Sequence, residues 1–266
     1  MDLTVISEIA DGAKIAPDVR IGQCCVIGPD VVVESGTVLG CRVTVAGRTT
    51  IGADNVIQDG CVLGVVPQDL KYHGRPTYLV IGDLNRFGPN VTAHVGTEEG
   101  GGLTRIGDDN VLEAGAHIAH DCFVDDRTHI GPAVLLAGHI RVETGAVLDE
   151  IVGVHHFTTI GRFSRVGART PVTHDVPPFV FFASDGYYNS PPAVKGIHEQ
   201  GLEAANLSPS DAGDVRQAFR RLFEDKRGRI VKVRELLAQT DQVEPVRILC
   251  ESCMRSLTGR FGRHRE

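Results

Sequence analysis

The segment GAHIAHDC, residues 115–122, holds side chains of the types that transfer protons or bind metal ions. His117 and His120 lie three residues apart, and Asp121 and Cys122 follow directly. A histidine beside a carboxylate can act as a general base near neutral pH, whereas histidines with an acid or a thiol can bind zinc. The polar face of a strand would show the same residue types. The segment alone therefore leaves a catalytic base, a metal site and an exposed strand as interpretations.

The elements that must position these side chains repeat every six residues. Apolar residues occupy each sixth position in three series, Leu3 to Leu63, Ile81 to Ala93 and Ile106 to Val172. Glycine often follows, and small or β-branched residues recur four places later, so each unit predicts a short strand and a tight turn. The pattern resembles the hexapeptide repeat of left-handed parallel β-helices, in which three units form a coil of 18 residues. Such a solenoid would bury the repeated residues in one column and stack its coils about 4.8 Å apart.

Two insertions interrupt the repeat. The step from Leu63 to Ile81 contains 12 extra residues, and the step from Ala93 to Ile106 contains 7. With both removed, Leu63, Ala93 and Ile118 fall on one face of successive coils. We therefore expect both loops to leave from the same corner, with the segment after Ile118 at that corner in the next coil.

The same register gathers histidines along this corner. Seven of the 11 histidines lie between residues 94 and 156. A single outward histidine on a solenoid is usually only solvated, but several on one edge beneath two loops favour a functional site. Three neighbouring columns are expected: His120, Gly138 and His156; Asp121, His139 and Phe157; and His94, Ala119 and His155.

The loops and repeats resemble one enzyme family. The insertions read GVVPQDLKYHGRPT and GTEEGGGLT, and the repeats contain AHIAHDC, LAGHI, VHHF and HDVPPF. Together these motifs are similar to the UDP-N-acetylglucosamine O-acyltransferases that open lipid A biosynthesis. The resemblance covers the β-helix almost from end to end. It implies transfer of a 3-hydroxyacyl chain from acyl carrier protein to the 3-hydroxyl of UDP-N-acetylglucosamine, by a homotrimer with active sites between its subunits.

The resemblance also implies catalytic roles. Attack of a sugar hydroxyl on a thioester needs a base that titrates near neutrality, and His120 would be that base. Asp121 would support it or the sugar. The charge that develops on the thioester oxygen needs a hydrogen-bond donor, which the resemblance assigns to the backbone N–H of Gly138. A solvated acid and an ordinary turn glycine are the plain alternatives for these two residues.

Further residues are implied to bind substrate. Gln68, Asp69 and Lys71 would lie over the sugar nucleotide, where an acid accepts sugar hydroxyls and an ammonium group meets phosphate. The expected cleft-lining histidines are His117, His139 and His155, which match the family, with His94 and His156, which share its columns.

The chain changes character after Pro177-Pro178. Ser208 can cap a helix that begins at Pro209, and helical spacing of apolar residues continues to Leu257. We expect a mainly β protein, with a left-handed parallel β-helix over residues 1–183 carrying inserted loops 64–80 and 95–105, and an α-helical C-terminal domain over 184–266. Residues 216–266 contain 13 Lys and Arg against 7 Asp and Glu. This basic module could receive the acidic acyl carrier protein or simply be a solvated helix surface.

Composition limits the other partners. A content of 42% hydrophobic residues fits a soluble globular protein, and no segment approaches the roughly 20 apolar residues of a membrane-spanning helix. The N-terminus shows no signal-peptide pattern, so we expect a cytoplasmic protein without membrane insertion. Seven cysteines without framework spacing indicate reduced thiols. No cofactor, bound metal or nucleic-acid partner is expected.

Departures from the family keep two alternatives open. His156 stands where the family shows Gln, and Ala204 and Ala205 replace an Arg pair that would bind phosphate, a loss for which Lys195 could compensate. A divergent paralogue acting on another UDP-sugar, such as a 3-amino one, or binding without catalysis, is the first alternative. The second is a zinc-dependent hydratase on the same fold, with ligands such as His117, His120 and His139, which would leave the QDLKY loop unexplained.

Overall fold

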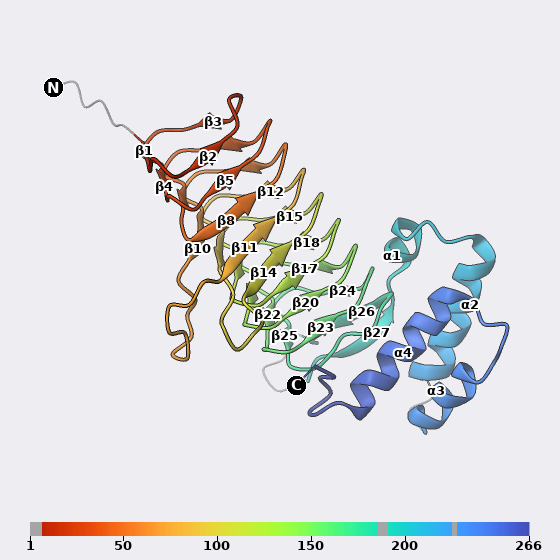
Figure 1. Ribbon diagram of the computed structural model, residues 1–266. Helices are drawn as coiled ribbons and strands as arrows, with labels where there is room; N and C mark the ends of the chain where they lie inside the picture. The colour runs from red at the N-terminus through yellow and green to blue at the C-terminus, as the bar shows by residue number, and fades with distance from the viewer. Residues whose placement is uncertain (1–6, 186–190, 225–227, 266) are drawn as a thin grey trace.

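The computed structural model describes residues 7–185, 191–224 and 228–265 (Figure 1). Its larger part is a parallel β-helix in which every third strand joins the same sheet, so each coil contributes one strand to each of three faces. The sheets contain 9, 8 and 10 strands. The 9-stranded sheet carries the segment of interest and consists of β1 (Glu8–Ile9), β4 (Val26–Ile27), β7 (Thr44–Val45), β10 (Val62–Val65), β13 (Thr92–His94), β16 (His117–Ile118), β19 (Leu135–Leu136), β22 (Gly153–Val154) and β25 (Pro171–Val172).

The other two sheets complete the prism. The 8-stranded sheet consists of β2 (Lys14–Ile15), β5 (Val32–Val33), β8 (Arg48–Ile51), β11 (Tyr78–Ile81), β14 (Leu103–Ile106), β17 (Phe123–Val124), β20 (Arg141–Val142) and β23 (Thr159–Ile160). The 10-stranded sheet consists of β3 (Arg20–Ile21), β6 (Val38–Leu39), β9 (Val56–Ile57), β12 (Arg86–Phe87), β15 (Val111–Leu112), β18 (His129–Ile130), β21 (Val147–Leu148), β24 (Arg165–Val166), β26 (Val180–Ala183) and β27 (Ala193–Ile197).

The six-residue repeat forms the interior column, as the sequence predicts. Every repeat residue from Ile27 to Val172 is buried, and a fully buried aliphatic side chain of this size stabilises a fold by about 1.5–3 kcal/mol. Ile9 is 47% exposed because it lies in the first coil, where fewer residues cover it. Leu3 lies outside the described residues.

The helical part begins later than the sequence suggests. Strand β27 pairs antiparallel with β26, so the sheet continues past the expected boundary at residue 183. The pairing satisfies backbone groups that an uncovered last strand would leave open. The helices that follow are α1 (Glu199–Ala204), α2 (Pro209–Phe219), the π-helical turn η1 (Arg220–Glu224), α3 (Arg229–Leu237) and α4 (Glu244–Thr258).

Local sequence accounts for these helices. The hydroxyl of Ser208 caps α2 by accepting a hydrogen bond from the amide of Asp211, and Pro209 occupies the first turn. The helices pack around a core of their own beside the last coils (Figure 1), in which Val215, Leu222 and Leu249 are buried. No helix among the described residues is long and apolar enough to cross a membrane.

Candidate active site

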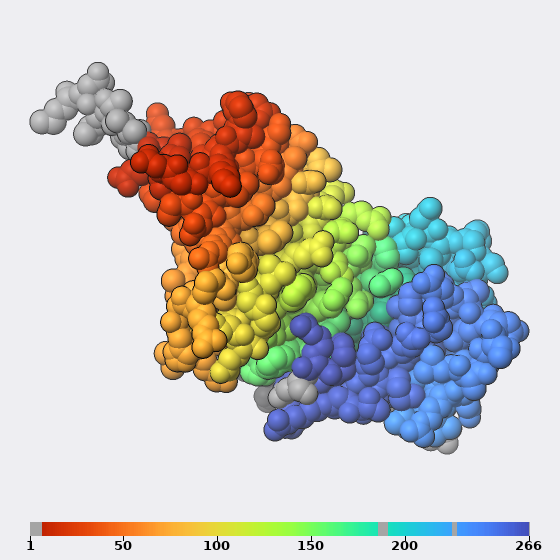
Figure 2. Space-filling model, viewed as in Figure 1, coloured from red at the N-terminus to blue at the C-terminus, as the bar shows by residue number. Residues whose placement is uncertain are grey.

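Both inserted loops leave from one corner of the β-helix. Leu63 pairs with Ala93 and Ala93 with Ile118 in successive coils, which confirms the register expected from the sequence. The loops protrude side by side (Figure 1, Figure 2). Glu98 ties them together, because its Oε1 accepts hydrogen bonds from the amides of His73, at 3.1 Å, and Arg75, at 2.8 Å.

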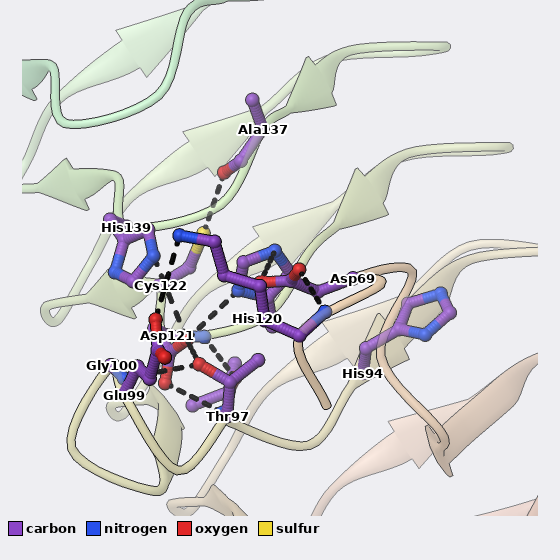
Figure 3. Close-up of polar contacts among 12 residues, drawn as sticks. Asp69, His94, Thr97, Glu99, Gly100, His120, Asp121, Cys122, Ala137 and His139 are labelled. Atoms are coloured by element: carbon purple, nitrogen blue, oxygen red, sulfur yellow. Dashed lines mark hydrogen bonds and ion pairs between the residues drawn. The ribbon is translucent and has the colours of Figure 1, made fainter. Parts of the chain in front are cut away.

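His120 lies at this corner, next to Asp121 (Figure 3). Its Nδ1 is 2.8 Å from Oδ2 of Asp121. Asp121 has a φ of 58°, a left-handed turn that an Asp tolerates better than most residues and that brings its carboxylate back to the neighbouring ring. With the Nδ1 proton donated to the carboxylate, Nε2 of His120 is free to accept a proton.

Thr97, from the second loop, completes the support of Asp121. Its amide and hydroxyl donate to the two carboxylate oxygens at 2.9 and 2.6 Å. Asp121 is only 1% exposed, and although burial raises its pKa, the hydrogen bonds from His120 and Thr97 hold that pKa below its ordinary value. The carboxylate therefore stays ionised beside the imidazole, and Asp121 is not a solvated turn acid.

Gly138 lies directly against His120 in the next coil. A β-carbon at Gly138 would come within 2.4 Å of Cε1 and 2.7 Å of Nε2 of the His120 ring. The position therefore needs glycine for a close approach between backbone and imidazole. His120 and Gly138 therefore lie next to each other in successive coils, as expected from the sequence.

His139 forms the next wall of the site. Its ring stacks on Phe157, with centroids 4.4 Å apart, and meets His120 edge-on at 5.2 Å. Its Nε2 lies 3.9 Å from Oδ2 of Asp121, too far for a direct hydrogen bond. Burial, with the charges of His120 and Arg265, lowers the pKa of His139 against the opposing effect of Asp121. His139 is thus kept neutral beside the pair formed by His120 and Asp121, which we call the dyad.

His117, on β16 in the same coil as His120, forms a second pair with His94, on β13 one coil earlier. Their rings lie edge-on with centroids 5.2 Å apart. Nδ1 of His117 is 2.8 Å from the Thr92 hydroxyl, and Nδ1 of His94 is 2.8 Å from the carbonyl of Val66. Burial and the neighbouring histidines lower the pKa of His117. These contacts fix both rings at the edge of the corner.

A groove of 780 Å³ runs along this edge over the 9-stranded sheet. The expected site residues that line it are Gln68, His117, His120, Gly138 and His155. Side chains of Leu135, Val154 and Pro171 give it an apolar stretch toward the C-terminal coils. The groove therefore offers a polar end at the dyad and an apolar continuation.

The remaining expected residues lie at the rim. Asp69, in the first loop, has an Oδ2 3.9 Å from Nε2 of His120. Lys71 is exposed and pairs with Glu99 at 3.5 Å, which again joins the two loops. His156 is exposed, and its ring lies 3.8 Å from that of His155 between centroids.

Lys195 lies elsewhere. Lys195, on β27, forms an ion pair with Asp185. It lines a separate pocket together with Arg216 and Phe219 of α2. That pocket shares no lining residue with the groove. Ala204 and Ala205 end the short helix α1.

The metal ligands expected from the sequence, His117, His120 and His139, do not come together as one group. Among the described residues, His120, Asp121 and His139 have ligand atoms close enough to hold an ion, within 4.8 Å of one another, and His117 is not part of this group. The Asp121 carboxylate already accepts three hydrogen bonds. The buried thiol of Cys122 donates to the carbonyl of Ala137, and burial raises its pKa to about 12, so it is not a ready metal ligand.

Sequence reasoning missed several residues of the site. Thr92 orients His117, and Thr97 orients Asp121. The hydroxyl of Thr97 lies in a loop, which carries no periodic signal, whereas the column register did place Phe157 beside His139. Arg265, which donates to the carbonyl of His139, lies 126 residues away in the sequence.

Known proteins resemble this chain over most of its length. No protein-family model matches it. It is 40% identical over 215 residues, 81% of this chain and 80% of the other, to the acyl-[acyl-carrier-protein]–UDP-N-acetylglucosamine O-acyltransferase of Verminephrobacter eiseniae.

Solved structures show the same similarity. The UDP-N-acetylglucosamine acyltransferase of Bacteroides fragilis superimposes with a TM-score of 0.87 at 26% identity, covering 93% of this chain and 95% of that one. The UDP-N-acetylglucosamine O-acyltransferase of Moraxella catarrhalis superimposes with a TM-score of 0.86 at 32% identity, covering 92% and 93%. The expected fold class, a mainly β protein with a left-handed parallel β-helix and a helical C-terminal module, is confirmed.

Proposed function

The chain belongs to the acyl-[acyl-carrier-protein]–UDP-N-acetylglucosamine O-acyltransferase family, and we propose that it transfers a 3-hydroxyacyl chain from acyl carrier protein to the 3-hydroxyl of UDP-N-acetylglucosamine, the first step of lipid A biosynthesis. The observation that carries the proposal is the His120–Asp121 pair at the polar end of an open groove. The pair lies beneath two loops that are joined by hydrogen bonds and an ion pair. It is the arrangement that acyl transfer to a hydroxyl needs, a base with an ionised support beside space for two substrates.

His120 acts as the general base. Its Nε2 takes the proton of the sugar 3-hydroxyl as the oxygen attacks the thioester carbonyl carbon and the new C–O bond forms. Asp121, ionised and held by Thr97, accepts the Nδ1 proton in a hydrogen bond and stabilises the imidazolium. When the tetrahedral intermediate collapses, the C–S bond breaks and His120 returns the proton to the carrier's thiolate.

Gly138 supplies the oxyanion donor. Its backbone lies next to Cε1 and Nε2 of the His120 ring, so a carbonyl that receives the attacking oxygen near Nε2 also comes close to this backbone. A backbone N–H fixed in a stacked coil needs no reorganisation as charge develops, which is the source of such stabilisation. A larger residue would displace the base and block the carbonyl at once.

The first loop positions the sugar nucleotide. The 3.9 Å between Oδ2 of Asp69 and Nε2 of His120 is too long for a direct hydrogen bond, so the Asp69 carboxylate lies beside the base, where it can accept a hydrogen bond from another hydroxyl of the sugar. Gln68, on the groove lining, and the exposed ammonium of Lys71 lie on the same loop, where they meet sugar and phosphate oxygens. His94, His117, His139, His155 and His156 line or flank the same edge.

The assembly and setting are part of the proposal. The groove is open, and Leu135 on its lining is 55% exposed in the single chain. A homotrimer would cover this apolar stretch with a neighbouring subunit and so form a channel for the acyl chain. The enzyme would act in the cytoplasm, where its carrier-bound and nucleotide substrates are soluble.

The test is a direct assay. Purified protein is incubated with UDP-N-acetylglucosamine and 3-hydroxyacyl carrier proteins of several chain lengths, and acylated sugar nucleotide is measured by mass. Product at one or more lengths supports the proposal. A parallel reaction with a 3-amino UDP-sugar separates the paralogue from the main proposal, because an amide product alone would assign the other acceptor. A folded protein that forms neither product would refute acyl transfer.

A further inference from the structure

The C-terminal residues fold back onto the coils that carry the site. After α4, residues Arg260 to Arg265 form what we call the C-terminal strap, which begins with a small bridge between Arg260 and Arg263. Gly262 takes a φ of 73°, and its carbonyl accepts a hydrogen bond of 2.9 Å from the amide of Asp175. The strap therefore crosses the β-helix just after β25.

Two residues anchor the strap through buried groups. Arg263 is 6% exposed and donates from Nη1 to the carbonyl of Thr173 at 2.9 Å. His264 donates its backbone amide to Oδ2 of Asp175 at 3.0 Å, and its Nδ1 lies 2.8 Å from the same oxygen. Asp175 is 4% exposed, and its Oδ1 accepts from the amide of Thr159 at 2.8 Å. One carboxylate thus joins the strap to the coil.

The strap ends at the catalytic corner. Nη1 of Arg265 donates to the carbonyl of His139 at 3.0 Å, and the guanidinium is partly buried. Because the donor is charged, this hydrogen bond is stronger than one between neutral groups. Arg265 therefore contacts His139, which follows Gly138 directly and lies one coil after His120.

His139 occupies a left-handed corner of the coil. Its φ is 62°, close to the 58° of Asp121 and the 62° of Phe157 at the same corner in the neighbouring coils. The peptide before His139 is held on both sides, since the amide of His139 donates to the carbonyl of His120 and the carbonyl of Gly138 accepts from Phe157. The peptide after His139 is held by Arg265.

We infer that Arg265 is a positioning residue for the acyl transfer proposed above, and that the anchored strap fixes the Gly138–His139 turn against the ring of His120. The inference rests on the proposed function, because its consequence is a change in the rate of that reaction. Without the guanidinium, the His139 carbonyl exchanges a fixed donor for water and the turn gains freedom. The ring of His139 and the backbone of Gly138 then face His120 in the productive arrangement for a smaller fraction of the time.

The test compares matched arginine substitutions in the strap. Arg265→Met removes the charge but keeps a long side chain, Arg265→Lys restores a cationic donor, and Arg260→Met is the control, because Arg260 is exposed and lies over the ring of Phe261. We expect kcat to fall about tenfold in Arg265→Met, the order of one charge-assisted hydrogen bond, with the KM for UDP-N-acetylglucosamine unchanged. Arg265→Lys should recover most of the loss, and Arg260→Met should match the unmodified chain.

The outcomes separate the two claims. Activity in the unmodified chain with an unchanged kcat in Arg265→Met would overturn the positioning role. A lowered melting temperature with normal kcat would also overturn it, since that is the result of a purely structural clamp. An inactive unmodified chain would instead count against the proposed function.

A second variant tests whether the strap acts as one unit. Asp175→Asn leaves a single side-chain oxygen for the partners that Asp175 now serves with two, and so loosens the anchor of His264. If Arg265 acts through the anchored strap, the double variant Asp175→Asn/Arg265→Met will lose less kcat than the product of the two single-variant losses. Losses that multiply fully would show that the anchor and Arg265 act independently, and the strap inference would fail.

Discussion

Nδ1 of His120 lies 2.8 Å from Oδ2 of Asp121, although the two residues are adjacent in the chain. On an ordinary strand, neighbouring side chains point to opposite faces. The pair forms here because Asp121 occupies a left-handed corner with φ 58°, which turns its carboxylate back beneath the preceding imidazole. The pairing of these two side chains is therefore a property of the coil corner, and Thr97 of the second loop holds the carboxylate in place.

His120→Ala should lower kcat by roughly 10²- to 10⁴-fold, the usual contribution of a positioned general base. The side chain lies outside the interior column, so the oligomeric state by size-exclusion chromatography should not change. His129→Ala is the matched control, since His129 is exposed on β18 and pairs with Glu113 at 3.2 Å. Normal turnover by His120→Ala would show that another group is the base.

Thr97→Val tests the support of Asp121 with little change in side-chain shape. The substitution removes a hydroxyl that donates at 2.6 Å to a carboxylate 1% exposed, and unsatisfied buried charge is costly. We expect a fall in kcat of about tenfold, together with a loss of stability of about 1–3 kcal/mol in denaturant unfolding. Thr50→Val, on β8 outside the site, should change neither. Equal behaviour of the two variants would remove Thr97 from the mechanism.

The sequence predicted the parts of the site that follow the coil. An apolar column that must stack in register fixes which corner residues are neighbours, so the contacts of His120 with Gly138 and of His139 with Phe157 could be expected from a spacing of 18. Thr97 could not be placed, because loop residues obey no period. Arg265 could not be placed either, since its position depends on how the helical module turns back across the coils. The strand β27 was missed for a similar reason, because it forms by pairing with the edge of β26, and that edge exists only once the coils have stacked.

Gly138→Ala should disable the site by steric conflict. The new methyl group would lie 2.4 Å from Cε1 of His120, so the ring must move away from Asp121 or the turn must open. We expect at least a hundredfold loss of kcat, in the range attributed to a displaced base. Gly196→Ala, on β27, adds a methyl group with no heavy atom within 4 Å and serves as the control. A fully active Gly138→Ala enzyme would contradict the close approach.

Lys71→Ala should act on binding. Lys71 is exposed, and its ion pair with Glu99 is equally exposed. Because exposed ion pairs contribute little to stability, its removal should hardly change the melting temperature. Loss of an ammonium that meets a phosphate should raise the KM for UDP-N-acetylglucosamine about tenfold and leave kcat near its original value. Lys14→Ala, exposed on β2, is the control. An unchanged KM would place the QDLKY loop outside the nucleotide site.

The pH dependence of stability should reveal the partly buried histidines. Burial lowers the pKa of His117, His139 and His174 below the ordinary value of 6.5. In the folded state these rings resist protonation, so below pH 6.5 the unfolded chain binds more protons and the free energy of unfolding falls. The melting temperature should therefore be nearly constant above about pH 7 and decline as the pH falls from about 6.5 toward 5.

His117→Gln identifies one source of this decline. Gln keeps an oxygen that can accept from the Thr92 hydroxyl, which now lies 2.8 Å from Nδ1 of His117, but it does not titrate. The variant should lose less stability than the unmodified chain over the same pH range, because one group that binds protons only on unfolding is gone. Asp121 adds a separate decline at lower pH, since its depressed pKa means that its stabilising contribution is lost only as the pH falls below about 3.8. Parallel melting curves for His117→Gln and the unmodified chain between pH 7 and 5 would show that His117 is not among the rings that burial keeps neutral.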